Sequence, residues 1–413
     1  MRILVLKKIP TLLGALLASL LTLSLVIYPK EGVEAAVAGL KVFWEIVLPS
    51  LLPFFILSEV MLGMGVVHFI GVLLEPLMRP LFNVPGVGAF ALSMGLAAGY
   101  PMDAVITAKF RRSGLCTRIE GERLLSFTNT ADPLFIFGAV AVGMFGRPEL
   151  GVLIGMAHYL SSFTVGIIFK YYHYRKGGQG VDLNPDTCRD GIIRRAFRAL
   201  IKARRDDGRP IGKLMGDSVR ESMSTLLMIG GFIIFFAVLV RILAAIGIVG
   251  VLIPVLAEIL KILGIDPRLA HALFNGILEI DLGAMATSKA LAPLMDKAMI
   301  AGWIIAWSGL SVHGQVASVI HDTDIRMTPY VIARFLHGVF AAWYTYLLMG
   351  PLAPVMGPLM RAVPVAAGFD PIDRIIFSGR QLVLGFGILI GLSLLVYFSR
   401  KYRLIRVKKT YKI

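Results

Sequence analysis

Residues Ser126 to Gly138 read S-F-T-N-T-A-D-P-L-F-I-F-G, and the interpretation of the whole chain starts from this stretch. Pro133 is preceded by five polar side chains: Ser126, Thr128, Asn129, Thr130 and Asp132. An almost wholly apolar run follows, from Leu134 to Phe145. Polar residues, then proline, then apolar residues are typical of a helix start. In a bilayer the pattern indicates a helix interrupted at membrane depth, which is tolerated only where the break lines a cavity or is covered by protein.

The composition places most of the chain in a membrane. Of its 413 residues, 57% are hydrophobic and 16% are charged. This balance over such a length is that of a multispanning membrane protein. The apolar runs are long and continuous, and they lack the two-residue alternation of an outer-membrane barrel. We therefore predict an all-α polytopic membrane protein.

The basic charge follows the membrane topology. The formal net charge is +16, from 42 Lys and Arg against 26 Asp and Glu. Because the basic residues stand in loops and tails beside apolar spans, we interpret them by the positive-inside rule and predict no nucleic-acid partner. The longest polar region, from Arg175 to Arg220, holds twelve basic and six acidic residues, a net charge of 12 − 6 = +6. We expect this loop and the basic tail after Arg400 to be cytoplasmic and to contact anionic lipid.

Changes in composition divide the chain into five segments. Residues 1–41 hold a first transmembrane helix and a connector, and residues 42–173 a first repeat. The basic loop, residues 174–221, separates it from a second repeat in residues 222–350. Residues 351–413 hold a Pro-rich segment, a last transmembrane helix and the tail.

The two repeats share an order of elements rather than residue identity. Each has a long apolar block, then a break among small residues with acids, then a polar-to-apolar break. Matching positions lie 180 residues apart: Phe55 and Phe235, Gly95 and Asn275, Thr128 and Ser308. Within the first repeat, Val84 to Phe110 carries G-L-A-A-G-Y-P, which favours a helical hairpin or a span with a broken centre.

Charge predicts the relative orientation of the repeats. The apolar run from Pro10 to Tyr28 could pass for a signal peptide, but we interpret it as an uncleaved span because it is long enough to cross. Its basic N-terminal flank is then cytoplasmic, and the first repeat starts on the far side. The second repeat starts at the cytoplasmic loop. Two similar units that start on opposite faces form an inverted repeat, the plan of many secondary transporters.

Three long motifs resemble a known family. They are V-L-P-S-L-L-P-F-F-I-L-S-E (Val47 to Glu59), G-V-V-H-F-I-G-V-L-L-E-P-L-M-R-P-L-F (Gly65 to Phe82) and D-P-L-F-I-F-G-A-V-A-V-G (Asp132 to Gly143). They resemble the YlbJ, or stage V sporulation protein V, family of sporulation integral membrane proteins, within the nucleoside-recognition or Gate domain group. The resemblance covers nearly the whole chain.

The resemblance implies a function and a fold. It implies a spore-forming bacterium, and export of dipicolinic acid across the outer forespore membrane from mother cell to forespore. It also implies that both repeats are Gate-like, with the discontinuous helices or re-entrant hairpins of concentrative nucleoside transporters. The family has small residues after the first-repeat Gly-aromatic-Pro, whereas this chain has Met102 and Asp103, so the contacts of Gly99 to Asp103 stay open.

An anionic aromatic substrate needs positive potential within the membrane. Helix N-termini at broken helices supply it without an unpaired buried Lys or Arg, and an aromatic ring such as that of Tyr100 or Trp307 could stack on the substrate. We expect Thr128 to Thr130 at one such N-terminus and Ser308 to Ser311 at the other. The predicted substrate-binding residues are Tyr100, Thr128, Asn129, Thr130, Asn275, Ser308, Ser311 and Gln315. Each hydroxyl could instead bond a helix carbonyl, and each aromatic ring could simply pack.

Three carboxylates stand in apolar surroundings, where an acid is costly and usually functional. Together with a nearby histidine they form the predicted proton-coupling set: Asp132, Glu279, Asp281 and His313. The alternative for each acid is a structural partner, either an arginine or free backbone N–H groups. His68 and His158 are interpreted as structural.

Other classes of function remain as alternatives. A non-transporting scaffold of the spore envelope would tolerate apolar replacements at the breaks, and a nucleoside transporter would share the fold. The chain has no H-E-x-x-H or G-x-S-x-G motif, so we predict that it is not an enzyme. Cys116 and Cys188 suggest neither a disulfide framework nor a metal site, and no cofactor is expected. The oligomeric state is left open.

Overall fold

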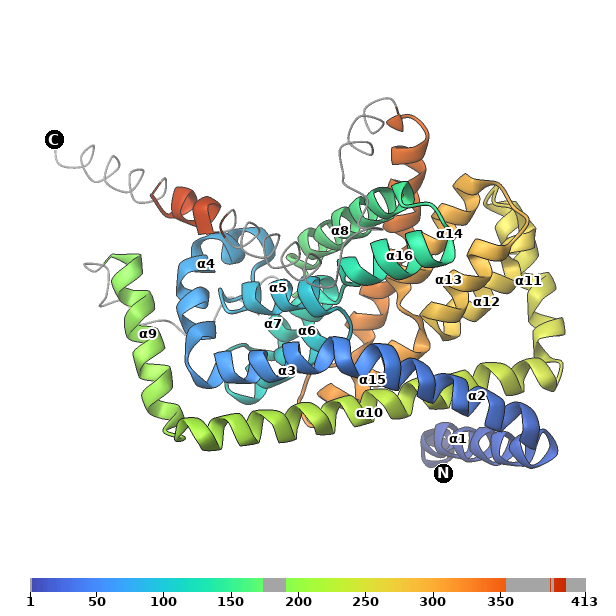
Figure 1. Ribbon diagram of the computed structural model, residues 1–413, viewed down its shortest axis with the longest axis horizontal. Coiled ribbons are helices and arrows are strands. Elements are labelled where there is room, and N and C mark those ends of the chain that lie inside the picture. Colours follow the sequence, from blue (N-terminus) through green and yellow to red (C-terminus); the bar gives the residue numbers. More distant parts are fainter. Residues whose placement is uncertain (1, 174–190, 354–386, 388–389, 399–413) are drawn as a thin grey trace.

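The computed structural model describes residues 2–173, 191–353, 387 and 390–398, and these fold almost entirely into helices (Figure 1). In this part of the chain four stretches are long and apolar enough to cross a membrane: Glu149–Phe169, Ile211–Ala245, Leu294–Ile320 and Met327–Met349. The number rises to six when each of two bent helix pairs counts as one span. The prediction of an all-α polytopic membrane protein is therefore confirmed.

The N-terminal part consists of two bent helix pairs. Its elements are α1 (Arg2–Ile27), α2 (Pro29–Val42), the π-helix η1 (Phe43–Val47), α3 (Leu48–Gly63) and α4 (Val66–Phe82). The first pair bends by 103° at Pro29 and the second by 83° at Gly65. Gly65 has a φ of +80°, and the carbonyl oxygen of Leu200 lies where a Cβ atom would project. Glycine is the residue that fits both conditions.

The rest of the first half contains a hairpin and an interrupted helix. Its elements are α5 (Gly88–Ala98), α6 (Met102–Arg112), α7 (Arg118–Thr128), the π-helix η2 (Leu134–Met144) and α8 (Glu149–Phe169). A Cβ on Gly95 would lie 3.3 Å from the Cβ of Asp103. Eight residues of continuous helix would span about 12 Å, so the chain folds back on itself between these residues. The hairpin expected within Val84 to Phe110 is present.

The second half repeats this order. Its elements are α9 (Ile192–Asp207), α10 (Ile211–Ala245), α11 (Ile248–Ile262), the short 3₁₀ helix η4 (Pro267–Leu269), α12 (Ala270–Leu278), α13 (Ile280–Lys289), α14 (Leu294–Trp307), α15 (Gly309–Ile320) and α16 (Met327–Met349). α12 and α13 also form a hairpin, because Gly276 and Gly283 are in contact across Glu279. α14 and α15 are separated by Ser308 alone.

The segment from α2 to α3 and the helix α10 lie side by side. Gly39 of α2 lies against Ile234 of α10, whereas Gly63 of α3, further along the chain, lies against Leu214, which comes earlier in α10. The segment from α2 to α3 is therefore antiparallel to α10, as Figure 1 shows along the lower edge of the molecule. Both halves then turn at a left-handed glycine, Gly65 or Gly247.

The apolar cores join elements of both halves. In one core η2 and α8 pack against α12, α13 and α14, through residues such as Ile136, Leu153 and Ile304. In another, α6 and α7 pack against α15 and α16, through residues such as Ala104 and Val316. The interruptions of the helices lie between these cores, so neither half encloses them alone.

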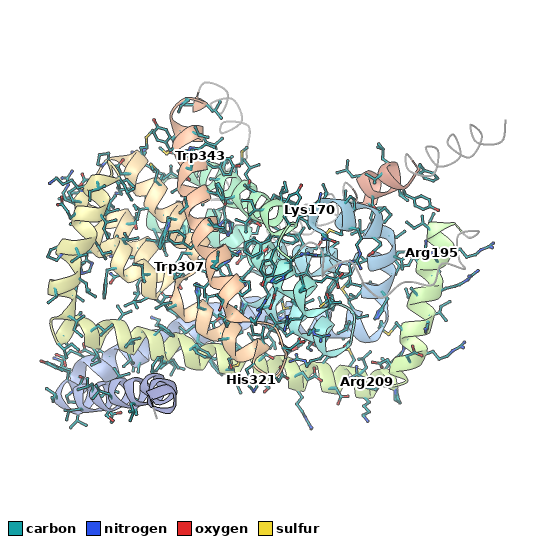
Figure 2. The ribbon with its side chains drawn as sticks, turned by 180° about the vertical axis from the view of Figure 1, so that it is seen from behind. Lys170, Arg195, Arg209, Trp307, His321 and Trp343 are labelled. Carbon is teal, nitrogen blue, oxygen red and sulfur yellow. The ribbon has the colours of Figure 1, made fainter. Side chains whose placement is uncertain are left out.

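One end of the molecule gathers the charged loops. Arg111 and Arg112, at the end of α6, pair with Asp324 and Asp322, in the loop between α15 and α16. Lys109 pairs with Glu221 near the start of α10, so this end is also that of the basic region. In Figure 2, His321 and Arg209 lie along the lower edge of the molecule, below Trp307 and Trp343.

The described part of the predicted loop is helical. α9 packs on α4 through Ile192 and Ala196 and leaves Arg194 and Arg198 exposed. α10 begins at Ile211, so residues 211–221 are helical and continue into the apolar part of α10. Residues 174–190 lie outside the described residues, as does most of 351–413, where the Pro-rich segment, the last span and the tail are predicted.

Candidate functional site

Two hairpin tips and two helix breaks meet in the interior. A Cβ on Gly99, at the first tip, would lie 2.7 Å from Oδ2 of Asp132, at the break between α7 and η2. A Cβ on Gly309, at the break between α14 and α15, would lie 3.1 Å from Cα of Glu279, at the second tip. The Tyr100 hydroxyl donates to the Ile305 carbonyl at 2.6 Å and so links the first tip to the second break.

The first break is organised by a buried carboxylate. Oδ2 of Asp103, on α6, accepts a hydrogen bond from the Thr128 hydroxyl at 3.0 Å, and Oδ1 accepts one from the Asn129 side-chain amide at 2.9 Å. The amide oxygen of Asn129 accepts a hydrogen bond from the Tyr330 hydroxyl at 3.1 Å. All four residues are buried. Every polar atom of the Asn129 side chain therefore has a protein partner.

A buried arginine joins the first break to the second. Arg334, on α16, is fully buried and donates to the carbonyl oxygens of Asn129, Ser126 (2.7 Å) and Ala306 (3.5 Å). These oxygens lie at the C-terminal ends of α7 and α14, where the helix dipoles favour a cation. The guanidinium forms no salt bridge with a described carboxylate, and its Nε has no partner within the described chain. Its carbon lies 5.6 Å from the ring centre of Tyr330.

Two side chains of α8 hold the residue in the middle of the first break. His158 Nε2 accepts a hydrogen bond from the Ala131 amide at 3.0 Å, and the Tyr159 hydroxyl donates to the Ala131 carbonyl at 3.1 Å. His337 Nε2, on α16, donates to the His158 carbonyl at 2.9 Å. The tautomers follow, because the Nε2 of His158 accepts and that of His337 donates. α8 and α16 thus fix this peptide from one side.

Two of the half-helix N-termini are capped by acids of the chain itself. Asp132 accepts a hydrogen bond from the Phe135 amide at 2.9 Å at the start of η2. Glu279 accepts one from the Leu282 amide at 2.8 Å at the start of α13. A carboxylate at a helix N-terminus satisfies free N–H groups and meets the positive end of the dipole. Asp132 lies at the helix break of the first half, whereas Glu279 lies at the hairpin tip of the second half, so the two caps are not at matching positions.

The second break is simpler. Ser308 takes a φ of +70°, and its hydroxyl donates to the Trp307 carbonyl at 2.6 Å. The Trp307 indole donates to the Ile277 carbonyl at 3.1 Å. The ring of His313 lies 4.3 Å from that of Trp307 and 5.1 Å from that of Tyr330. This aromatic group lies beside two other buried residues of α15, Ser311 and Gln315. Neither of their side chains hydrogen-bonds another described residue.

Comparison with known proteins gives the family. A family model described as "Gate: Nucleoside recognition" matches residues 44–168. The chain is 46% identical over 347 residues to the sporulation integral membrane protein YlbJ of Bacillus subtilis (strain 168), covering 84% of this chain and 85% of that protein. The chain belongs to the YlbJ family. No solved structure matches this YlbJ-family protein.

The structure brings together most of the residues predicted from the sequence. Around the junction of tips and breaks lie Tyr100, Thr128, Asn129, Thr130, Asp132, Glu279, Ser308, Ser311, His313 and Gln315. Asn275 is separate: its side chain contacts the exposed His271, at 3.4 Å. Asp281 is half-buried one residue inside α13 and forms no salt bridge with a described residue. The role of each residue stays a prediction.

Two details of the sequence-based picture of this YlbJ-family protein are wrong. α7 continues through Thr128, so Thr128 to Thr130 lie at the C-terminal end of a half-helix, and Asp132 occupies the N-terminus that follows. The expectation of positive potential without a buried Lys or Arg also fails, because Arg334 stands at the junction. Tyr330 and Arg334 were missed, and Asp103 was noted without a role. An ionisable residue within an apolar span was the available signal for Arg334.

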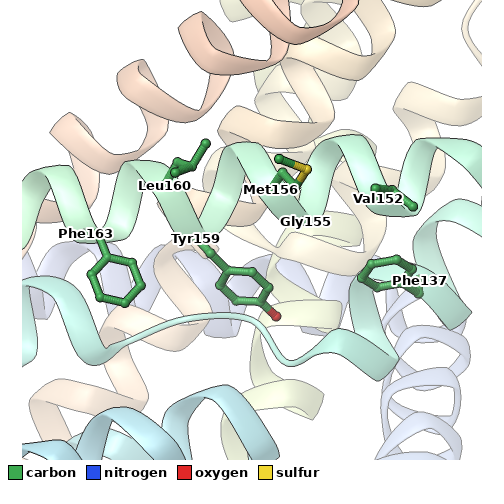
Figure 3. Close-up of a pocket in the computed structure, with 7 residues that line it drawn as sticks. All are labelled: Phe137, Val152, Gly155, Met156, Tyr159, Leu160 and Phe163. Carbon is green, nitrogen blue, oxygen red and sulfur yellow. The ribbon is translucent and has the colours of Figure 1, made fainter. Parts of the chain in front are cut away.

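An apolar groove of about 330 Å³ lies between η2 and α8 (Figure 3). Its lining residues are Phe137, Val152, Gly155, Met156, Tyr159, Leu160 and Phe163. Only Tyr159 brings a polar side-chain atom, and that hydroxyl already bonds the Ala131 carbonyl. The groove therefore suits a hydrocarbon chain better than a charged ligand, and we do not count it as part of the polar site.

Proposed function

We propose that this YlbJ-family protein is a secondary transporter of a small anionic aromatic acid. The observation that carries the proposal is the convergence of both hairpin tips and both helix breaks, through Tyr100–Ile305, Gly99–Asp132 and Gly309–Glu279. Interrupted backbone at membrane depth is costly and is found where it serves a binding site or pathway. A scaffold needs no such junction.

The proposed architecture is an inverted repeat like that of concentrative nucleoside transporters. Three features support it: the antiparallel contact of α3 with α10, the matching left-handed turns at Gly65 and Gly247, and the shared order of hairpin and broken helix. In such a fold, alternating access comes from movement of one repeat or bundle against the other around a fixed site. Arg334 and Tyr100 are then contacts between the repeats.

The proposed substrate is dipicolinate, moved across the outer forespore membrane. The sporulation name of the relative supports the setting. The aromatic group of Trp307, His313 and Tyr330 supports a planar ring, and Ser311 and Gln315 offer hydrogen bonds not already used within the described chain. The basic α9 and the tail would face the mother-cell cytoplasm and anionic lipid.

Proton coupling is proposed at the carboxylate caps. Protonation of Asp132 or Glu279 would remove the negative charge that its helix N-terminus attracts and would weaken the cap. Because Glu279 lies against Gly309, loosening this cap would free the second tip from the second break. Asp281 and His313 remain candidates for carrying that proton.

Uptake of labelled dipicolinate into proteoliposomes tests the proposal. We expect uptake by the wild type, strong loss in Asn129→Ala, and loss of dependence on a proton gradient in Glu279→Gln. Ser288→Ala is the matched control, since its hydroxyl bonds only the Met285 carbonyl on the surface of α13. Uptake that neither Asn129→Ala nor Glu279→Gln affects would refute the site. Absence of any acid transport would favour the scaffold.

A nucleoside transporter is the second candidate. The Gate match over residues 44–168, described as nucleoside recognition, favours it. Labelled uridine in the same proteoliposomes separates the two substrates. Uptake of uridine but not of dipicolinate would contradict the proposed anionic substrate and would still support a transporter.

A further inference from the structure

We propose that Arg334 is the anion-recognition residue of this site. In this structure its guanidinium binds carbonyl oxygens at two helix ends, and a substrate carboxylate would take their place. The inference rests on the proposed transport of an anionic acid and assigns its recognition to one residue.

The surroundings of Arg334 leave its charge poorly compensated. The residue is fully buried, and its partners are the neutral carbonyls of Ser126, Asn129 and Ala306. Taking a cation out of water is costly, and neutral carbonyls return less of that energy than a carboxylate. A carboxylate can also accept two parallel N–H bonds from the planar guanidinium. Nε, which has no partner within the described chain, is a donor already available for such a pair.

The nearest acid is tied to Arg334 through a shared neighbour. Asn129 donates its side-chain amide to Asp103 and offers its carbonyl to Arg334. Asn129 therefore stands between the Asp103 carboxylate and Arg334. The carboxylate itself accepts hydrogen bonds from Thr128 and Asn129. The negative charge of Asp103 would repel a ligand carboxylate placed at Arg334. Asp103 should therefore weaken the binding of an anion.

The neighbouring rings fit an aromatic acid. Tyr330 lies 5.6 Å from the guanidinium carbon, and His313 lies between Tyr330 and Trp307. A planar ring placed against this group would carry its carboxylate toward Arg334. When the substrate carboxylate binds the guanidinium, the carbonyl oxygens of Asn129 and Ala306 lose Nη1 of Arg334, the donor that they share. Substrate binding would thereby loosen the link between the end of α7 and the end of α14.

The test measures how binding depends on ligand charge. Dissociation constants are compared for dipicolinate, a dianion, and for pyridine-2,6-dicarboxamide, its neutral isostere, on purified wild type, Arg334→Gln and Arg334→Lys. Loss of a charge-assisted bidentate pair should weaken dipicolinate binding by about 10- to 100-fold in Arg334→Gln. Diamide binding should change little. Arg334→Lys should recover part of the preference for the dianion. Arg268→Gln, at an exposed pair with Asp266, is the control and should match the wild type.

A second variant keeps the inference testable if Arg334→Gln does not fold. Asp103→Asn keeps the side-chain shape and removes the competing charge. We expect it to bind dipicolinate more tightly, by about tenfold, because removal of a nearby like charge favours the anion, with unchanged diamide binding. A preference for the dianion that survives in Arg334→Gln, or dipicolinate binding that is equal or weaker in Asp103→Asn, would overturn the role of Arg334. If the wild type neither binds nor transports dipicolinate, the proposed function itself fails.

Discussion

The two helix breaks differ in how their polar groups are hydrogen-bonded. At the first, between α7 and η2, the polar groups are bonded within the protein: Asn129 to Asp103, Tyr330 and Arg334, and Ala131 to α8. At the second, Ser308 alone separates α14 from α15, and Ser311 and Gln315 are buried with no side-chain bond to a described residue. The contrast indicates that the first break holds the halves together, and that the second leaves groups for a ligand.

The difference has a local cause. The first break is a linker of several residues, so its peptide groups are satisfied by side chains from α8 and α16. At the second, Ser308 and Gly309 both adopt positive φ values, +70° and +73°, and the next helix starts directly after Ser308. Few backbone groups are freed there, and fewer side chains are needed to satisfy them.

The largest effect is expected at the arginine that joins the breaks. Arg334→Gln should lower the free energy of unfolding by about 3 kcal/mol, because buried carbonyls at two helix ends lose a charged donor. Arg268→Gln, at an exposed pair, should unfold like the wild type. Chemical or thermal unfolding of the purified protein in detergent measures both. Equal free energies of unfolding for the two variants would show that Arg334 does not stabilise the fold by joining the two breaks.

A matched pair of hydroxyl deletions tests the contrast itself. Thr128→Ala should cost about 1–2 kcal/mol, because it removes a hydrogen bond to the buried Asp103 carboxylate. Ser311→Ala should cost less than about 0.5 kcal/mol, because its hydroxyl has no side-chain partner in the described chain. The same unfolding measurement applies. A larger loss for Ser311→Ala than for Thr128→Ala would reverse the assignment of the two breaks.

The smallest effect concerns the ion pairs that join the loops of the two halves. Arg111 lowers the pKa of Asp324 below its ordinary value, chiefly through their hydrogen bonds. The pair therefore stabilises the folded state above about pH 4, the ordinary aspartate pKa, and this contribution disappears as the pH falls through the lowered pKa. Arg111→Gln should cost less than about 1 kcal/mol at pH 7, because the pair is partly exposed. The two proteins should become equally stable in acid, as unfolding at several pH values would show.

The sequence was informative wherever the cause was local. The D-P pair at Asp132 and Pro133 marked a helix start, and the G-Y-P at Gly99 to Pro101 marked a hairpin tip. The side chains of Thr128 and Asn129 both bond Asp103, but the sequence did not indicate this partner. Asp103, Tyr330 and Arg334 come from other helices, and Arg334 bonds carbonyls about 200 residues earlier in the chain. No periodicity in α16 marks a side chain whose partners are the ends of distant helices.

The direct test of the central contrast is dipicolinate binding to a protein in which both Ser311 and Gln315 are replaced by alanine, with its unfolding temperature measured in parallel. The account predicts that the dissociation constant rises at least about tenfold, the loss of roughly one to two net hydrogen bonds, while the unfolding temperature stays within a few degrees of the wild type. An unchanged dissociation constant, or unfolding as severe as that of Arg334→Gln, would contradict it.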